Sequence, residues 1–266
     1  MVRGLPDDPA HLRAVRDRCH AAVSAARDLP PVEDGHLVVA RARWAARHRS
    51  VAVELARSVA ALPRVSVSLG DGPGGRAIAA QVQAHCGGGR PWQTLARSVY
   101  VVPPEGRPYV GRSAHSRRSA VNQSRGAGVV CRLLTAADLA ENESVRRFGY
   151  CLLPDCAGRT YVAFGPSGVA LGVSHVHVDG ALAELAQAMQ ADDDPLTGNA
   201  RFALFACVVE DLAASGVELL VVLSSWLWVA YGTRVFQNVL GFVPCHLLGL
   251  AAQQDVDGER QPSRSG

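Results

Sequence analysis

The clearest pattern of apolar and polar positions lies between residues 161 and 190, where three β-favouring runs are separated by two turns. The runs cover residues 161–164, 169–178 and 181–190, and the second turn is Asp179-Gly180. Asp-Gly between two strand-like runs favours a tight hairpin, because both central positions of that turn need a positive φ. We therefore predict three consecutive antiparallel strands, with a helix as the alternative for residues 181–190.

A long helix and a buried strand are predicted after this meander. Residues 192–198 form a polar loop, and Asn199 is expected to cap an amphipathic helix over residues 200–214 that ends at Ser215-Gly216. The apolar run 217–223 is typical of a buried strand. A short helix over 231–240 and a last strand over 243–250 complete the pattern.

The first half of the chain is richer in predicted helix. Helical spacing of small apolar residues covers 11–27 and 37–61. The alternation at 64–69 predicts a strand, and further helices are expected over 76–86 and 111–126, with strands at 98–102 and 129–134. Thr135 and Asp138 predict a capped helix start, because the threonine hydroxyl can accept the amide three residues on.

This order of elements predicts a mixed α/β protein with a mostly antiparallel central sheet flanked by helices. We divide it into a helix-rich N-terminal region (1–95), a sheet-containing domain (96–252) and a disordered tail (253–266). The 266 residues, 48% of them apolar, suffice for a substantial core.

Composition narrows the chemistry. All 27 basic residues are arginine, which excludes a Schiff-base or P-loop lysine, and a net charge of +3 spread along the chain lacks the basic face of a dedicated nucleic-acid binder. Seven irregularly spaced cysteines are typical of reduced thiols. No secretory signal is evident, and the longest apolar run, residues 219–231, is short for a membrane span. We expect a soluble cytoplasmic protein without membrane insertion.

Three stretches carry a resemblance to a known superfamily. Residues 200–222 contain a helix followed by Gly216-Val217-Glu218-Leu219-Leu220, and residues 232–244 contain a helix with an aromatic residue followed by Leu240-Gly241-Phe242. Residues 113–128 read Ser-x-x-x-Arg117-Arg118 and end at glycine. The first two are similar to the GNAT acyltransferase superfamily, and the third resembles its FemAB-like branch, which transfers acyl or aminoacyl groups to amines.

The resemblance implies provisional catalytic roles. A splayed central strand would supply an oxyanion-binding amide near residues 185–188. His175, His177 and Glu184 would be candidate proton acceptors, because the histidines project from one face and Glu184 lies on the paired strand. Tyr231 stands where many members place a general acid. The alternatives are an ordinary hydrogen-bonded role for each histidine and a packing role for Tyr231.

The resemblance also implies a donor site, formed by Leu185, Gln187, Gly198, Asn199 and Arg201. Acetyl-CoA-dependent members place a glycine-rich pyrophosphate loop before this helix, whereas this chain has Asp192-Asp193-Asp194-Pro195 there, whose carboxylates would repel a pyrophosphate. The implied donor is therefore acyl-CoA or aminoacyl-tRNA, with the departure favouring a FemAB-like or catalytically degenerate member. The acceptor would be a small-molecule or peptide amine, tRNA is a possible partner, and no metal is expected.

Three alternatives stay open at this point. Residues 70–75 satisfy G-x-G-x-x-G between a strand and a helix, as in a methyltransferase or dinucleotide-binding enzyme, although the expected acidic residue about 20 positions on is missing. Cys151 and Cys156, with the two histidines, give a weak zinc pattern. A GNAT-like scaffold or binding protein without catalysis is the third. The arginines of residues 113–128 form either a solvated helix face or a patch for tRNA or phosphate.

Overall fold

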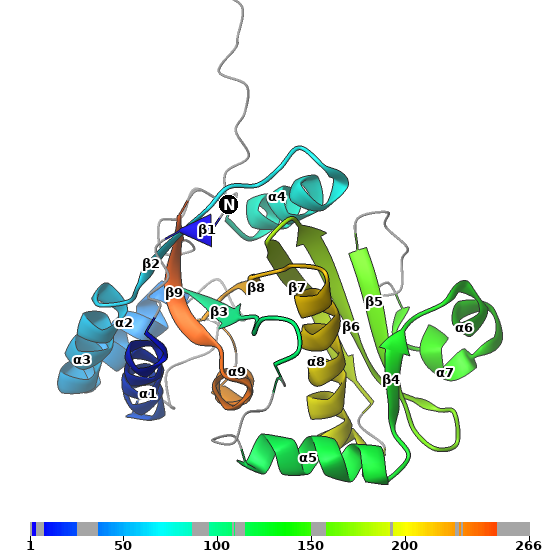
Figure 1. The fold of residues 1–266 in the computed structure, drawn as a ribbon. Helices are drawn as coiled ribbons and strands as arrows, with labels where there is room; N and C mark the ends of the chain where they lie inside the picture. Colours follow the sequence, from blue (N-terminus) through cyan, green and yellow to red (C-terminus); the bar gives the residue numbers. More distant parts are fainter. Residues whose placement is uncertain are drawn as a thin grey trace, which may run out of the picture.

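The computed structural model describes residues 2–3, 8–25, 37–86, 96–107, 109, 115–149, 158–191, 194–226, 229 and 231–248. Within these residues, nine strands form one sheet in the order β1-β2-β9-β3-β8-β7-β6-β5-β4, with helices on both faces (Figure 1). The predicted mixed α/β class is confirmed. None of the described helices combines the length and apolar character that a bilayer crossing requires.

The predicted meander is present. β5 (Gly158–Phe164), β6 (Ala170–Asp179) and β7 (Leu182–Gln190) pair antiparallel in sequence order, and β4 (Val130–Leu133) adds to β5 at the sheet edge. α8 (Thr197–Ala214) then leads to β8 (Leu219–Ser225), which runs parallel to β7. The predicted order of meander, helix and buried strand is therefore confirmed.

The other half of the sheet combines strands from both ends of the chain. β3 (Arg97–Val101) lies between β8 and β9 (Val243–Leu248), which follows α9 (Tyr231–Leu240). β2 (Arg64–Val67) is parallel to β9, and β1 (Val2–Arg3) pairs with β2. Residues of the N-terminal region therefore extend the same sheet.

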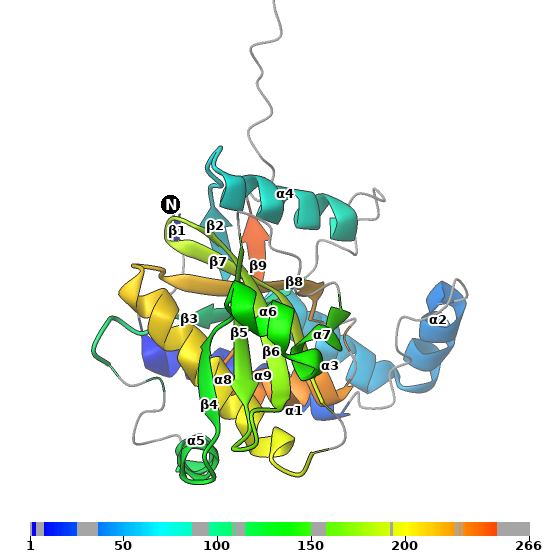
Figure 2. The same ribbon diagram turned by 90° about the vertical axis from the view of Figure 1, so that its right-hand side faces the viewer.

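Helices divide the core into layers on the two faces of the sheet. α8 and α5 (His115–Gly126) cover one face, where Phe205 and Leu212 pack with Tyr161 and Leu220. We call this the α8 face. The opposite face carries α1 (Pro9–Ala25) and α4 (Pro73–Cys86), and we call it the α4 face. α4 lies beside the β6–β7 end of the sheet (Figures 1 and 2).

Short helices complete the two ends of the sheet. α6 (Ala136–Glu141) and α7 (Glu143–Arg146) lie beside β4 and β5 (Figure 1), where Val145 packs with Val162. Thr135 and Asp138 form the predicted cap, since the Thr135 hydroxyl accepts from the Asp138 amide at 3.2 Å. α2 (Leu37–Arg47) and α3 (Arg49–Ala60) replace the single predicted helix over 37–61, because His48 has a non-helical ψ of 46°.

Two local predictions were wrong. Asn199 does not cap α8, which begins two residues earlier after Leu196; its side-chain amide instead donates to Gln123 at 3.0 Å. The hairpin turn is also shifted by one residue, because Asp179 and Leu182 still pair and leave Gly180 and Ala181 as the centre. Only Gly180 has a positive φ, 57°, as a type II′ turn requires.

Candidate functional site

The two central parallel strands pair over a short length and then diverge. β7 and β8 pair only over residues 182–184 of β7, which lie opposite residues 219–221 of β8. Beyond this point β7 continues against β6 as far as Gln190, while β8 continues against β3. Ala186 has no opposite residue on β6, because Leu185 pairs with Val176 and Gln187 pairs with His175. The divergence expected near residues 184–188 is confirmed, and a β-bulge marks it.

A cleft of about 400 Å³ opens at this divergence. We call it the transfer cleft. Its walls come from β7, β8, α9 and the first turns of α8, and are lined by Leu185, Ala186, Gln187, Ala188, Gln190, Arg201, Val222, Ser224, Gly232, Thr233, Phe236, Gln237, Leu240 and Phe242. Its volume lies within the usual range of small-molecule sites. The described lining contains amides, hydroxyls and one guanidinium, but no carboxylate, imidazole or thiol.

Arg201 supplies the positive charge of the transfer cleft. Its guanidinium carbon lies 4.4 Å from the centre of the Phe236 ring and 5.1 Å from that of Phe202. Burial lowers the pKa of Arg201, and its Nε has no hydrogen-bond partner among the described residues. No described carboxylate forms an ion pair with it, so the guanidinium is available for an anionic group of a ligand.

The structure brings together part of the predicted donor site. Leu185, Gln187 and Arg201 line the transfer cleft, whereas Gly198 and Asn199 lie in the first turn of α8 outside its lining. Tyr231 is the first residue of α9 and precedes Gly232, which lines the cleft. The side chain of Tyr231 lies outside the described residues.

The predicted proton acceptors gather on the opposite side of the sheet. His177 and Glu184 alternate with residues of the α8-face core, including Val176 and Ala183, so they project toward the α4 face. His177 Nδ1 lies 3.0 Å from Glu184 Oε2, and both side chains are buried. None of His175, His177 and Glu184 lines the transfer cleft.

His175 extends this buried polar group. Its Nδ1 lies 2.8 Å from Thr160 Oγ1, and its ring meets that of His177 edge to face at 5.0 Å. The two histidines therefore share one face, as the strand spacing predicted, and both are hydrogen-bonded within the fold. This arrangement ties β5, β6 and β7 together through side chains as well as backbone.

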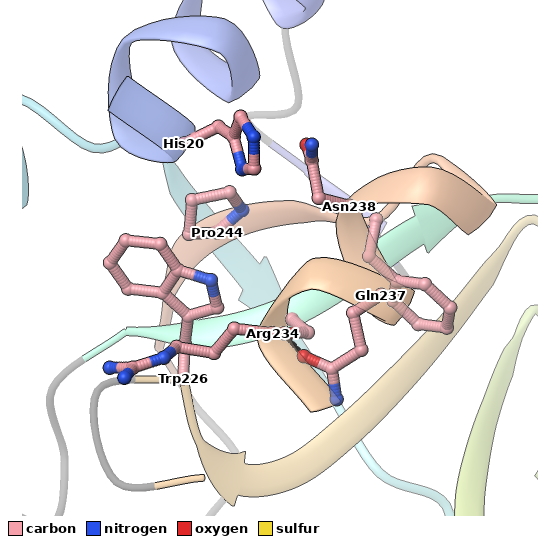
Figure 3. A pocket seen from close by; sticks show the side chains of 8 residues that line it. His20, Trp226, Arg234, Gln237, Asn238 and Pro244 are labelled. Carbon is pink, nitrogen blue, oxygen red and sulfur yellow. Dashed lines mark hydrogen bonds between the residues drawn. The ribbon is translucent and has the colours of Figure 1, made fainter. Parts of the chain in front are cut away.

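A second, much smaller cavity lies between α1, α9 and β9 (Figure 3). Its volume is about 10 Å³, and it is lined by His20, Ser98, Trp226, Arg234, Gln237, Asn238, Phe242 and Pro244. Ser98 donates to Gln237 at 2.7 Å across it, while Asn238 Oδ1 has no partner among the described residues. A space of this size holds at most one water, so a substrate site here is excluded.

The glycine-rich loop at residues 70–75 packs against the chain itself. The Gly70 amide donates to Asp179 Oδ2 at 2.7 Å, and a Cβ on Gly74 would lie 1.8 Å from the Val178 carbonyl oxygen. The loop therefore docks α4 against the β6–β7 hairpin. Gly74 and Gly75 permit close backbone approach, because a Cβ on Gly75 would lie 2.0 Å from the Gly70 carbonyl oxygen, so these two glycines have a structural role.

The zinc pattern receives no support from the described residues. Cys151 and Cys156 lie outside them, and within the described ranges no group of three or more His, Cys, Asp or Glu side chains is arranged to hold a metal ion. Cys207 packs against the α8-face core, where burial raises the pKa of its thiol to about 11. That thiol is therefore protonated at neutral pH.

Several cleft residues were missed by the sequence reasoning. Ser224 lies one residue beyond the strand predicted over 217–223, and Thr233 lies within the helix predicted over 231–240; nothing in their local pattern distinguishes them from packing residues. Phe236, the aromatic residue of the helix predicted over 231–240, contacts Arg201 at the cleft wall. The sequence signal that could have indicated this contact is an arginine in the α8 helix and an aromatic residue in the next helix, α9.

Comparison with solved structures finds distant likenesses. The C-terminal domain of a putative lysylphosphatidylglycerol synthetase from Agrobacterium fabrum has a TM-score of 0.44 and 12% identity, over 56% of this chain and 58% of that one. L-PGS from Bacillus licheniformis gives 0.43 and 10%, over 56% and 57%. A GCN5-related N-acetyltransferase from Kribbella flavida gives 0.35 and 12%, over 68% and 77%.

These likenesses do not assign an activity. The matched regions span less than two thirds of the first two chains, and all three TM-scores lie below 0.5. No protein-family model matches the chain, and no curated protein matches its sequence. Function must therefore be argued from the cleft.

Proposed function

We propose that this protein transfers an acyl or aminoacyl group from an activated donor to an amine within the transfer cleft. The observation that carries the proposal is the divergence of β7 and β8 after Glu184, which opens a cleft beside backbone of β7 and the guanidinium of Arg201, whose Nε has no hydrogen-bond partner among the described residues. In such a cleft the guanidinium of Arg201 could bind a negatively charged group of the donor, and backbone amides of β7 could bind its carbonyl oxygen.

The proposed step needs stabilisation of an oxyanion. The amine nitrogen forms a bond to the acyl carbon, charge passes to the carbonyl oxygen, and the bond to the leaving sulfur or oxygen then breaks. An amide aimed at that oxygen stabilises the intermediate more than the substrate. We assign this role to the Ala186 amide, because Ala186 is the bulged residue of β7 and lies beyond the last β8 pair.

The proposed donor is acyl-CoA or aminoacyl-tRNA, held through a phosphate by Arg201. Asp194 does not line the transfer cleft, and its Oδ1 accepts from the Leu196 amide at 2.8 Å. Asp192 and Asp193 lie outside the described residues. A guanidinium partly covered by two aromatic rings suits a phosphate, since its planar donors can pair with two oxygens at once.

Proton transfer is proposed to involve Tyr231 and solvent. As the attack proceeds, the amine must lose a proton and the leaving group must gain one. Tyr231 precedes a cleft residue and stays our candidate for the acid. His175, His177 and Glu184 face the α4 side of the sheet, so we propose that they stabilise the fold.

The absence of acid–base side chains among the described cleft residues favours a second candidate function, ligand binding without turnover. The same cleft would then hold the donor-like ligand, and Arg201 would keep its role. The two functions differ in whether a new amide is formed.

The test is a mass-spectrometric search for amide products. The full chain is incubated with acetyl-CoA or aminoacyl-tRNA and a panel of primary amines, and binding is followed by thermal shift. We expect product from one donor. Arg201→Gln should weaken donor binding about ten-fold, the loss of one to two charged hydrogen bonds. Arg57→Gln is the matched control, because Arg57 is exposed, pairs with Glu54 on α3 and does not line the cleft.

Ala186 provides the catalytic test. Ala186→Pro removes the backbone amide and should abolish transfer. Ala186→Ser keeps the amide and should preserve transfer. Thermal unfolding verifies that both variants fold. Binding without product would support the second candidate, and the absence of both binding and product would contradict both functions.

A further inference from the structure

A second cleft, of about 340 Å³, lies on the other side of the Leu240–Val243 segment from the transfer cleft. We call it the arginine cleft. Leu240 and Phe242 line the transfer cleft, whereas Gly241 and Val243 line the arginine cleft. Its remaining wall comes from α1, which packs beside β9 (Figure 1), and from α5.

Three guanidiniums converge on the arginine cleft from two helices. Arg13 and Arg16 are three residues apart on α1 and therefore share a helix face. Arg117 reaches it from α5. Arg16 pairs at 3.2 Å with Asp17, and the Asp17 side chain is 62% exposed. Arg13 and Arg117 form no ion pair with a described carboxylate, so the cleft carries a net positive charge.

Arg117 is held in place by backbone. Its Nη1 donates to the Leu240 carbonyl at 2.6 Å, which uses one of the five guanidinium donors. Gly241 has a φ of 103°, and a Cβ there would lie 3.0 Å from that nitrogen. Glycine at this position therefore leaves room for the guanidinium at the cleft wall.

Two buried tyrosines contribute aromatic surface and hydroxyls. Tyr100 is 7% exposed and Tyr109 is 6% exposed, and both rings pack edge-on against Phe205. The Tyr109 hydroxyl makes no hydrogen bond of good geometry with a described residue. Burial raises its pKa, and the nearby Arg117 opposes part of that rise. The hydroxyl therefore stays protonated and can donate.

We propose that the arginine cleft binds the phosphate group of a small organic molecule. Three guanidiniums set against one exposed carboxylate match the double negative charge of a phosphomonoester better than the single charge of a carboxylate. The buried tyrosines can donate to a phosphate oxygen and contact an apolar body. A cleft of about 340 Å³ suits a small molecule. This site is separate from the transfer cleft and does not depend on acyl transfer.

Calorimetric titration of the full chain tests the site, with phenyl phosphate as probe and benzoate as its carboxylate counterpart. Phenyl phosphate should bind more tightly than benzoate, and more weakly as salt is raised, because ions screen exposed charges. Arg13→Gln combined with Arg16→Gln should weaken binding at least ten-fold. Arg18→Gln is the matched control on the same helix, since Arg18 does not line the cleft, and it should change binding less than two-fold.

Four results would overturn the proposal. The first is that phenyl phosphate does not bind at millimolar concentration, and the second is that benzoate binds as tightly as phenyl phosphate. The third is that Arg18→Gln weakens binding as much as the double substitution does. The fourth is a loss confined to Arg201→Gln, which would place the phosphate in the transfer cleft. Because Arg13 is exposed and the Arg16 side chain is 25% exposed, neither belongs to the buried core, and unfolding curves of the variants should match the parent and exclude misfolding.

Discussion

Backbone contact at single glycines determines how α4 docks on the sheet. The α4 glycine Gly74 leaves no space for a methyl group, whereas Gly72, two residues earlier, has no heavy atom within 4 Å of a built Cβ. Substitution at Gly74 therefore tests close packing of α4, and substitution at Gly72 measures the effect of replacing a glycine where there is space for a methyl group.

Gly74→Ala should therefore lower the free energy of unfolding by about 1–3 kcal/mol, because the added methyl group forces α4 away from Val178. Gly72→Ala should change it by no more than about 0.5 kcal/mol. Urea unfolding monitored by circular dichroism measures both. Equal effects of the two substitutions would contradict the proposed close approach.

A second residue-scale effect depends on pH. The Arg132 guanidinium donates to both oxygens of Asp138, at 2.5 and 2.7 Å, and lowers the pKa of that carboxyl below its ordinary value; the Thr135 amide adds a further bond. A lowered folded-state pKa contributes stability above the unfolded pKa of about 4 and loses it as pH falls toward the folded value.

Asp138→Asn should consequently cost about 1 kcal/mol of unfolding free energy at neutral pH, the usual value of a cap and an exposed pair. The difference from the parent protein should shrink as pH is lowered from about 5 toward 2. Urea unfolding at several pH values provides the measurement. A difference that stays constant with pH would refute the role of the ionised carboxylate.

At the scale of elements, β6 and β7 are joined by buried polar side chains as well as by their ladder. The His177–Glu184 pair lies on the α4 face, and its two side chains are 5% and 2% exposed. Removing one partner from such a pair leaves a buried polar group unsatisfied. This cost is independent of any chemistry in the transfer cleft.

Glu184→Gln should lower the free energy of unfolding by about 1–3 kcal/mol while leaving donor binding unchanged. Glu210→Gln, at an exposed pair with Arg125, should change it by less than about 0.5 kcal/mol. Chemical unfolding and ligand titration distinguish the two effects. Lost transfer with unaltered stability would instead assign Glu184 to catalysis.

Sequence patterns predicted elements well where the physical cause is local. The bounds of α9 match the prediction, and the meander and Thr135 cap follow from turn and capping chemistry. The start of α8 was misplaced because Asn199 satisfies its side chain on Gln123, far away in sequence. His177 lies on the α4 face of the sheet and Arg201 lies in the transfer cleft because of which helices cover each face. Local periodicity does not specify which helix covers which face.

For the whole molecule, the sheet class was predictable and its complete order was not. β3 between β8 and β9, and β2 beside β9, are pairings between distant segments. Apolar alternation predicts that a strand exists but does not identify its neighbour. The transfer cleft was anticipated from a resemblance, whereas the arginine cleft is lined by five segments, represented by Arg13, Tyr100, Tyr109, Arg117 and Gly241, and had no sequence signal beyond the arginines themselves.

The pairing of β2 with β9 also constrains biosynthesis. Arg64 lies opposite His246, so synthesis must pass residue 246 before the early strand can find its neighbour. Until then β3 likewise lacks both flanking strands, which emerge only after residue 219. The nascent chain must keep these apolar segments from aggregating until β9 has emerged, and this half of the sheet cannot be completed before then.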